Sequence, residues 1–144
     1  MAIMPNGDHA LRRLIGGEAA LSLKIYIVDD DADIIAFMTL LLEAAGHKVS
    51  SSVAGATALP EIKAKRPDCV LIDLVMAEMD GLDLCRELRK LPESSGLKVI
   101  FVSARANEYW RHHARDAGAD GYLGKPLDAD TFVRQVEDIV EGRT

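Results

Sequence analysis

Polar residues that could take part in chemistry follow three short apolar runs of this chain. Carboxylates follow two of the runs, as the pair Asp29-Asp30 and as Asp73, and Lys125 follows a third. The carboxyl ends of parallel strands meet at one edge of a sheet, which is where open α/β sheets bind ligands. Three carboxylates at one place repel one another unless a cation lies among them. The motifs therefore predict a divalent-metal site with one reactive carboxylate.

Mg²⁺ is the cation that this set of side chains suits. Hard cations of this kind take oxygen ligands, commonly one or two carboxylates with waters and phosphate oxygens. Asp30 and Asp73 are candidates for direct ligands, and Asp29 acts either directly or through water. A carboxylate is also a known nucleophile toward phosphoryl groups. The metal and Lys125 would then offset the charge of a group transferred to Asp73.

A hydroxyl stands at the end of a fourth apolar run. Ser103 follows residues 98–102 and could donate its hydroxyl to a phosphoryl oxygen. The neighbouring Ala104 is small, which leaves room for an incoming group. We therefore add both residues to the predicted site.

Strands and helices must alternate along the chain to bring these residues together. Apolar runs predict strands at residues 24–28, 48–52, 69–73, 98–102 and 121–123. Apolar residues at helical spacing predict helices at about 31–45, 55–65, 82–90, 107–117 and 128–140. Asp80 and Asp128 are the expected N-caps of the third and fifth helices. This alternation is typical of an α/β fold with a parallel sheet and crossover helices.

Composition narrows the classes of function. The chain has 144 residues, enough for one domain with one core. Its net charge of −6 argues against nucleic acid as a direct partner, because phosphate neutralisation needs a basic face. No apolar stretch reaches the ~20 residues of a membrane span, and no signal-peptide core is visible. Cys69 and Cys85 lack metal-site spacing and are expected to be reduced, so we expect a cytoplasmic protein.

Four segments, taken together, resemble the receiver domain of response regulators in bacterial two-component signalling. The resemblance covers residues 24–141. Its segments are Val28-Asp29-Asp30-Asp31, Ile72-Asp73-Leu74-Val75-Met76 with Met79-Asp80-Gly81, Val102-Ser103-Ala104, and Tyr122-Leu123-Gly124-Lys125-Pro126. The resemblance implies a flavodoxin-like (βα)5 fold, a doubly wound parallel sheet with strand order 2-1-3-4-5.

The resemblance assigns a role to each residue of the metal and acceptor site. Asp73 is the phosphoacceptor by this comparison. Asp29 and Asp30 hold Mg²⁺ together with Asp73 and the backbone carbonyl of Val75. The implied cofactor is Mg²⁺.

Further roles follow from the same resemblance. Ser103, Ala104 and Lys125 bind the phosphoryl group. Tyr122 is the switch aromatic, which turns inward when Ser103 moves toward the phosphate. The peptide bond before Pro126 is cis, as in the family.

Two positions resemble those that tune the phosphoryl lifetime in the family, Val75 and Arg105. An apolar Val75 offers no hydrogen bond to an attacking water. We therefore expect slow self-hydrolysis of the acyl phosphate. Ala77 stands where many members have proline, so the loop after Asp73 is expected to be looser.

The implied function is that of a single-domain response regulator. The phosphoryl donor would be the phosphohistidine of a sensor histidine kinase or a histidine phosphotransfer protein. The module turns over no external substrate, so we do not expect an enzyme. Its output, partner binding or onward phosphotransfer, would use the face formed by helix 107–117, strand 121–123 and the last helix. The resemblance also allows a homodimer.

Alternatives to this interpretation come from two directions. An aspartate-nucleophile phosphohydrolase uses similar topology, but it typically needs an Asp-x-Asp pair, and Leu74-Val75 follows Asp73. The second alternative is that the chain is the receiver fragment of a larger hybrid kinase or transcription regulator. Residues 1–23 form a separate leader before the receiver domain at 24–144, either flexible or a short docking helix.

Aromatic and histidine side chains gather on the predicted helix 107–117. Tyr109 and Trp110 either pack into the core or contact a partner, and the family's use of this face favours a partner. His112 and His113 point about 100° apart on a helix and cannot easily chelate one metal. They are expected at the surface.

Overall fold

Five parallel strands form a single sheet in the order β2-β1-β3-β4-β5. The structure is a computed structural model that describes residues 21–143. The strands are β1 (Lys24–Val28), β2 (Lys48–Ser52), β3 (Cys69–Ile72), β4 (Lys98–Ser103) and β5 (Gly121–Gly124). This is the order that the resemblance implied, so the flavodoxin-like α/β fold is confirmed.

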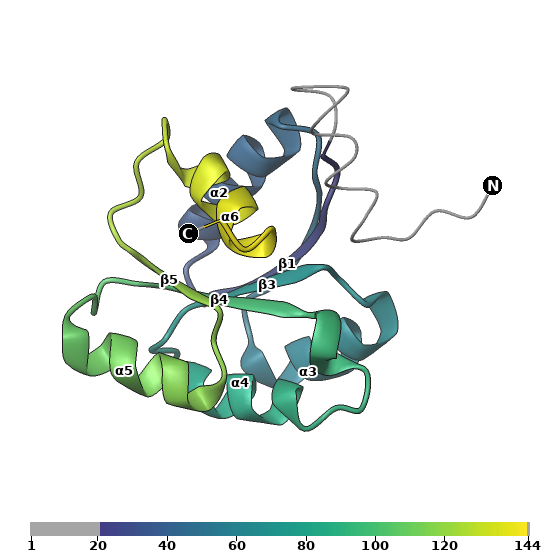
Figure 1. Cartoon of the computed structure of the whole chain (residues 1–144), viewed down its shortest axis with the longest axis vertical. Coiled ribbons are helices and arrows are strands. Elements are labelled where there is room, and N and C mark those ends of the chain that lie inside the picture. Colours follow the sequence, from purple (N-terminus) through teal and green to yellow (C-terminus); the bar gives the residue numbers. More distant parts are fainter. Residues whose placement is uncertain (1–20, 144) are drawn as a thin grey trace.

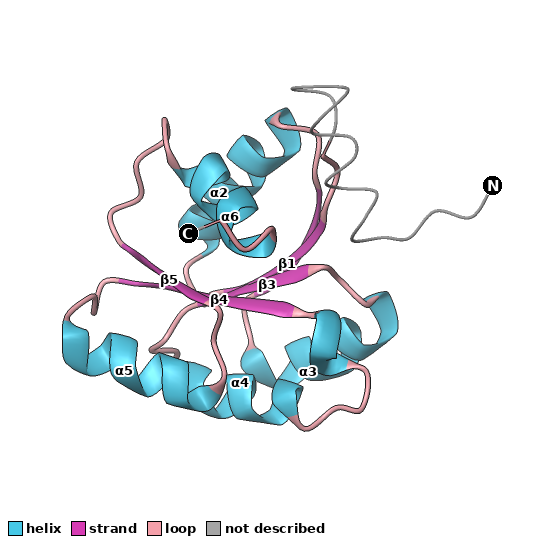
Figure 2. Cartoon of the chain, in the orientation of Figure 1, coloured by secondary structure: helices cyan, strands magenta, loops and turns pink. Residues whose placement is uncertain are grey.

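Helices connect the strands and cover both faces of the sheet. They are α2 (Ala32–Ala44), α3 (Gly55–Lys65), α4 (Gly81–Arg89), α5 (Glu108–Ala117) and α6 (Phe132–Val140), with a short 3-10 turn η2 (Ser94–Gly96). Helices α2 and α6 lie on one face, and α3, α4 and α5 lie on the other (Figures 1 and 2). The strand that follows β1 in sequence lies on one side of it, and the later strands lie on the other side. The connections that leave β1 and β3 therefore diverge, and a crevice opens between the carboxyl ends of these two strands, where such sheets bind ligands.

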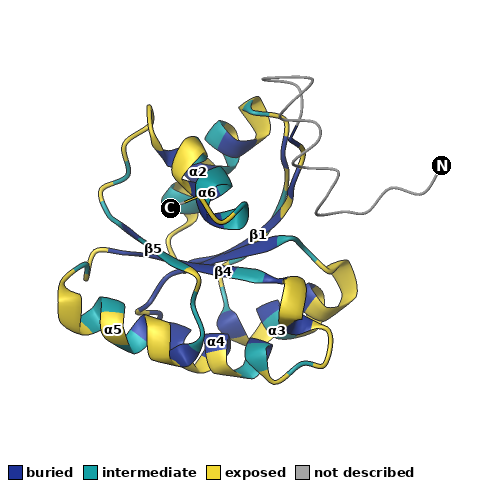
Figure 3. Cartoon of the chain, in the orientation of Figure 1, coloured by how far each residue is buried: buried dark blue, intermediate teal, exposed yellow. Residues whose placement is uncertain are grey.

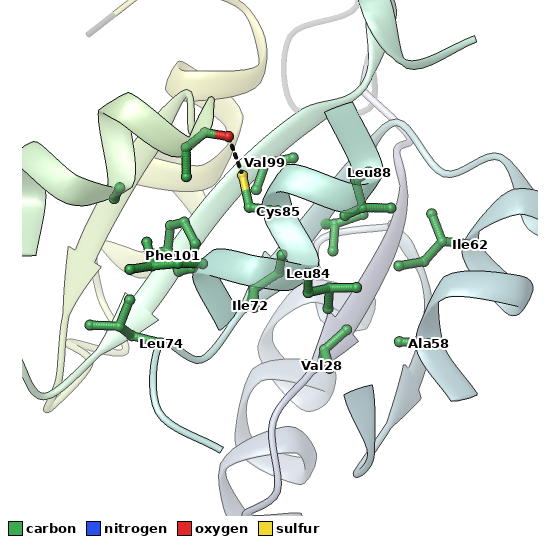
Figure 4. Packing of buried hydrophobic residues seen from close by; sticks show 14 of the residues in the cluster. Val28, Ala58, Ile62, Ile72, Leu74, Leu84, Cys85, Leu88, Val99 and Phe101 are labelled. Atoms are coloured by element: carbon green, nitrogen blue, oxygen red, sulfur yellow. Dashed lines mark hydrogen bonds between the residues drawn. The ribbon is translucent and has the colours of Figure 1, made fainter. Parts of the chain in front are cut away.

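Two apolar layers hold the helices to the sheet. The central strand β3 is buried along its whole length, which explains why its sequence is apolar without alternation. One layer joins the sheet to α3, α4 and α5, and Figure 4 shows Leu84 and Leu88 of α4 in it. There the Cys85 Sγ donates to the Ala117 carbonyl at 3.3 Å. The other layer lies under α2 and α6, and Figure 3 shows the sheet buried between the two.

Side-chain caps begin three of the helices next to the carboxyl edge of the sheet. Asp31 caps α2 and accepts from the N–H groups of Asp33 and Ile34. Asp80 caps α4, as predicted, and Asn107 caps α5. These caps satisfy backbone donors that a helix leaves unpaired in its first turn. They also fix where the loops that carry the site residues end.

Asp128 does not cap the last helix, contrary to the sequence prediction. Helix α6 begins at Phe132 with Thr131 at its N-cap. The Asp128 carboxylate accepts from the Asp130 N–H at 2.9 Å, and its carbonyl accepts from the N–H groups of Thr131 and Phe132. Aspartate bonds readily to the backbone two residues ahead, and here this local turn delays the helix. Ser103 also differs in place, since it is the last residue of β4 and does not follow it.

The described chain begins inside the predicted leader. Leu21 and Leu23 are buried in the layer under α2 and α6. The apolar residues at 10–15, for which a short helix was one alternative, lie outside the described residues. The division at residue 24 therefore stays a prediction. Among the described helices, none has the length and hydropathy that a membrane crossing needs.

Candidate functional site

Backbone pairing brings three loops together at the carboxyl edge of the sheet. The Asp73 N–H donates to the Val28 carbonyl at 2.9 Å, and the Lys125 N–H donates to the Ser103 carbonyl at 2.8 Å. The parallel ladders thus continue by one residue beyond β3 and β5. The sheet itself therefore holds the backbone from which the Asp73 and Lys125 side chains extend.

Three carboxylates converge at this edge. One oxygen from each of Asp29, Asp30 and Asp73 lies within 4.8 Å of the others. Asp29 is 1% exposed and Asp73 is 9% exposed, whereas Asp30 is open to solvent. The sequence prediction that these residues meet is therefore supported by their observed positions.

Lys125 is the one cation that the described residues place against these carboxylates. Its Nζ donates to Asp29 Oδ2 at 2.9 Å and lies 3.8 Å from Asp73 Oδ1. The other Asp29 oxygen, Oδ1, accepts from the Asp31 N–H at 2.9 Å. Both Asp29 oxygens are thus bonded to protein donors. One positive charge faces three negative ones, and the local charge is unbalanced.

The pKa of Asp73 reflects this imbalance. The pKa of its carboxyl group is raised to about 6, chiefly by burial and next by the neighbouring charge of Asp29. The Lys125 ammonium and the Val75 N–H, which bonds to the Asp73 carboxylate, work in the opposite direction. The negative charges of Asp29 and Asp30 therefore disfavour ionisation of Asp73.

The loop after β3 is shaped around Asp73. A Cβ on Gly81 would lie 2.3 Å from the Asp73 carbonyl oxygen, so only glycine fits where the loop returns to α4. The Gly81 N–H donates to the Leu74 carbonyl at 2.9 Å and closes the loop. Val75 lies within it with its side chain 50% exposed. The Ala77 N–H donates to Asp30 Oδ2 at 3.1 Å, which fixes the third carboxylate.

Ser103, Arg105 and Tyr122 form a hydrogen-bonded group beside the carboxylates. Ser103 is buried, and its Oγ accepts from the Arg105 N–H at 3.1 Å. The Tyr122 hydroxyl donates to the Arg105 carbonyl. Burial raises the pKa of Tyr122, which keeps the phenol protonated as a donor. Ala104, between these partners, is exposed.

The remaining site expectations concern Pro126 and the histidines. The Lys125–Pro126 peptide bond is cis, as the resemblance implied. His112 and His113 lie on α5, outside the carboxylate group. His112 pairs with Asp116 on the same helix at 3.3 Å.

The donor set fits a hard divalent cation. It consists of carboxylate oxygens with an excess of negative charge, which is the chemistry Mg²⁺ prefers. Asp30 and Asp73 have oxygens free of the Lys125 bond, whereas both Asp29 oxygens are engaged. Asp29 is therefore better placed to act through water or after a shift of Lys125.

Two parts of the site escaped sequence reasoning. The Ala77 N–H orients Asp30, and the Arg111 guanidinium lies 5.0 Å from the centre of the Tyr122 ring. Both are contacts between residues that are distant in sequence or depend on loop conformation. No local pattern in the chain marks either one.

A family model of the response regulator receiver domain matches residues 25–137. Protein PilH of Pseudomonas aeruginosa is 32% identical over 83% of this chain and 98% of its own length. The DNA-binding response regulator MtrA of Mycobacterium tuberculosis is 33% identical over 78% of this chain. The chain spans about half the length of MtrA, since the match covers 48% of it.

Solved structures show the same similarity. A CheY-like response regulator receiver domain protein from Methanospirillum hungatei has a TM-score of 0.76 at 27% identity. That match covers 83% of this chain and 94% of the other. The chemotaxis response regulator CheY4 of Vibrio cholerae has a TM-score of 0.78 at 22% identity over 83% of this chain and 99% of its own, which shows the common fold.

Proposed function

The chain belongs to the response regulator receiver domain family, and from this premise we propose that it accepts a phosphoryl group on Asp73. Receiver domains are signalling modules of two-component systems. The donor is the phosphohistidine of a sensor histidine kinase or a histidine phosphotransfer protein. The observation that carries the proposal is the buried Asp73 beside two further carboxylates and Lys125.

Mg²⁺ is the cofactor of the proposed reaction. Asp30 and Asp73 would hold it, with Asp29 and the Val75 carbonyl completing the protein ligands. The cation supplies positive charge that offsets the three carboxylates and the incoming phosphoryl oxygens. This is consistent with the excess of negative charge at the site.

The chain's own residues position the transfer. An Asp73 carboxylate oxygen attacks phosphorus, a P–O bond forms, and the P–N bond to the donor imidazole breaks with its electron pair returning to nitrogen. Lys125 transfers one hydrogen bond from the carboxylates to a phosphoryl oxygen. Ser103 donates its hydroxyl to another. Ala104 leaves the approach to Asp73 open.

Phosphorylation then shifts an equilibrium between two shapes of the neighbouring surface. Ser103 and Tyr122 are the switch residues, and both bond to Arg105 in this structure. The output face consists of α5, β5 and α6. A downstream protein, or a second copy of the chain, would bind there.

Val75 and Arg105 would set the lifetime of the acyl phosphate. The exposed Val75 side chain offers an attacking water no hydrogen bond. We therefore expect slow self-hydrolysis, measurable as decay of the phosphorylated mass after the donor is removed. A lifetime of seconds would contradict this part of the proposal. The same Val75 stands where a phosphohydrolase would need its second carboxylate.

Intact mass after incubation with acetyl phosphate and Mg²⁺ tests the proposal. The wild-type chain should gain one phosphoryl group, and Asp73→Asn should gain none. Asp83→Asn is the matched control, because Asp83 lies on α4 and pairs with Arg86. Omitting Mg²⁺ should also abolish the adduct. An adduct that survives in Asp73→Asn would place the acceptor elsewhere and overturn the proposal.

A further inference from the structure

A groove lies at the amino edge of the sheet, between the end of α3 and the edge strand β2. Its volume is about 390 Å³, which is in the range of small-ligand sites. Lys24 and Lys48, the first residues of β1 and β2, line it together with Lys65 from the last turn of α3. Asp73 follows the opposite, carboxyl end of its strand, so the groove is separate from the phosphoryl-acceptor site.

Two of these lysines oppose each other on neighbouring strands. Lys24 and Lys48 are register partners in the parallel ladder of β1 and β2, which places their Cα atoms about 5 Å apart. Both residues are exposed. Like charges at directly opposed positions of a sheet destabilise it. A neutral residue at either position would therefore suit the fold better, and the pair needs a reason outside folding.

No carboxylate of the described chain forms an ion pair with the three ammonium groups of the groove. The Lys24 Nζ donates to the Lys65 carbonyl at 2.7 Å, which is a neutral acceptor. Asp68 accepts from the Lys24 N–H at 2.8 Å, and Glu61 accepts from the Tyr26 hydroxyl. The dipole of α3 favours a cation in its last turn, which accounts for Lys65 but not for the two strand lysines. The groove thus carries unbalanced positive charge in a chain of net charge −6.

Neutral side chains complete the lining and indicate which anion fits. Ser50 follows Lys48 by two residues on β2, so both face the same side of the sheet, and Ser50 adds a hydroxyl to the groove. Ala64 and Pro67 add apolar surface. Ammonium and hydroxyl groups are donors that phosphate oxygens accept from. Two ammonium groups one strand spacing apart suit two adjacent phosphate groups.

We propose that this groove binds a small diphosphate-bearing anion, held by Lys24, Lys48 and Lys65. The phosphate oxygens would lie between the three ammonium groups and relieve the repulsion between the strand lysines. Ser50 would donate its hydroxyl to one of these oxygens. An organic substituent of the diphosphate would lie against the apolar surface at the end of α3. Binding changes no covalent bond and does not depend on phosphorylation of Asp73.

Isothermal titration calorimetry of the full chain with sodium pyrophosphate tests the site. EDTA is present, so that no divalent cation bridges the anion to the carboxylates at the other edge. Lys24→Gln and Lys48→Gln should each raise the pyrophosphate Kd at least about tenfold, as the loss of one charge-assisted hydrogen bond requires. Lys90→Gln is the matched control and should stay within about twofold, because Lys90 is exposed and pairs with Glu87 at 3.0 Å. Asp73→Asn should bind as the wild type does.

Urea unfolding gives a second measurement that does not depend on the heat of binding. Without ligand, Lys48→Gln should have a higher midpoint than the wild type, because the like-charge repulsion is removed. Pyrophosphate should raise the wild-type midpoint, since a ligand of the folded state stabilises it, and should leave that of Lys48→Gln nearly unchanged. Sodium sulfate at equal ionic strength controls for screening and should shift both proteins equally.

The choice of ligand separates the sources of a diphosphate group. Tighter binding of ADP than of pyrophosphate would assign an organic diphosphate, and equal binding would assign the diphosphate group alone. Sulfate binding as tight as that of pyrophosphate would overturn the proposal, as would pyrophosphate binding that neither lysine variant weakens. Preferential binding of a poly-glutamate peptide would also overturn it, because the groove would then serve an acidic protein segment.

Discussion

Two buried groups of ionisable side chains among the described residues differ in how their hydrogen bonds and charges are matched. At the carboxyl edge of the sheet, Asp29, Asp30 and Asp73 face the single ammonium of Lys125. Under α6, His47 lies 2.8 Å from Glu137 and is fully buried. Each group joins residues that are more than 85 positions apart in the chain.

Both ring nitrogens of His47 have a hydrogen-bond partner. His47 Nδ1 accepts from the Leu23 N–H at 3.0 Å. The ring proton therefore sits on Nε2 and donates to Glu137 Oε2. One residue thus ties the start of β1, the entry to β2 and helix α6 together. A satisfied buried group of this kind stabilises and positions the elements that it joins.

The carboxylate group lacks that balance, and the difference indicates which group binds a ligand. Burial and the neighbouring charge of Asp29 raise the pKa of Asp73, and both weaken the folded protein unless a cation is bound. Folding alone does not account for three carboxylates at one place. A buried polar group whose hydrogen bonds are matched serves to stabilise the fold, whereas a buried group with unmatched charge indicates a binding site.

Removal of the Lys125 charge should change stability more than any other substitution in either group. Lys125→Gln leaves the buried Asp29 without its counter-charge, and we expect the free energy of unfolding to fall by about 3 kcal/mol in EDTA. Saturating Mg²⁺ should restore most of this loss, because it binds the folded state alone. Urea unfolding with and without Mg²⁺ measures both quantities. A loss that Mg²⁺ leaves unchanged would contradict the proposed cation site.

The matching change in the other group is His47→Ala. It leaves the Leu23 N–H without an acceptor and Glu137 without this donor, so we expect a loss of about 2 kcal/mol in the free energy of unfolding. Mg²⁺ should not restore it, and phosphoryl uptake should continue. His112→Ala is the control, since His112 is exposed on α5 and should change stability by less than about 0.5 kcal/mol. Dependence of the His47→Ala loss on Mg²⁺ would refute the distinction between the groups.

Asp73→Asn should stabilise the metal-free protein. The change removes one of three like charges at nearly constant volume, and we expect a gain of about 1 kcal/mol at neutral pH after solvent screening. Chemical denaturation in EDTA at pH 7 measures the gain against Asp83→Asn. A destabilised Asp73→Asn would show that the carboxylates do not repel one another in the folded state.

The pH dependence of this gain sharpens the comparison further. The pKa of Asp73 is about 6 in the folded protein and ~3.9 in an unfolded chain, so the folded state binds the proton first as the pH falls. Above pH 6 the ionised carboxylate carries its full cost, and between pH 6 and pH 4 this cost is relieved. The difference between wild type and Asp73→Asn should therefore shrink by about 1 kcal/mol over that range. A difference that is constant from pH 4 to pH 7 would rule out titration of Asp73 as its source.

Much of the fold was predictable because its signals are local. All five strands were predicted within one or two residues, since fully buried parallel strands are apolar runs that end abruptly. Gly46 and Gly118 follow the ends of α2 and α5 with positive φ angles, a local signal for helix termination. Asp128 was misassigned because aspartate supports a turn as readily as a cap, and only the path of the chain after β5 selects between them.

The sequence by itself determined which residues form the site and that they lie at one edge of the sheet. Asp29, Asp73 and Lys125 each follow a strand directly and Asp30 comes one residue later, so the strand order places them at one edge. Their spacing is a property of the chain that needs no knowledge of packing.

The tertiary structure alone decided which side chains pair across elements. The His47–Glu137 bond, the contact of Arg105 with the Trp110 ring and the Ala77 bond to Asp30 each depend on how helices and loops lie against the sheet. Such contacts form between positions without a common period or motif. Their geometry is set by close packing of the whole domain, which no local segment of the sequence encodes.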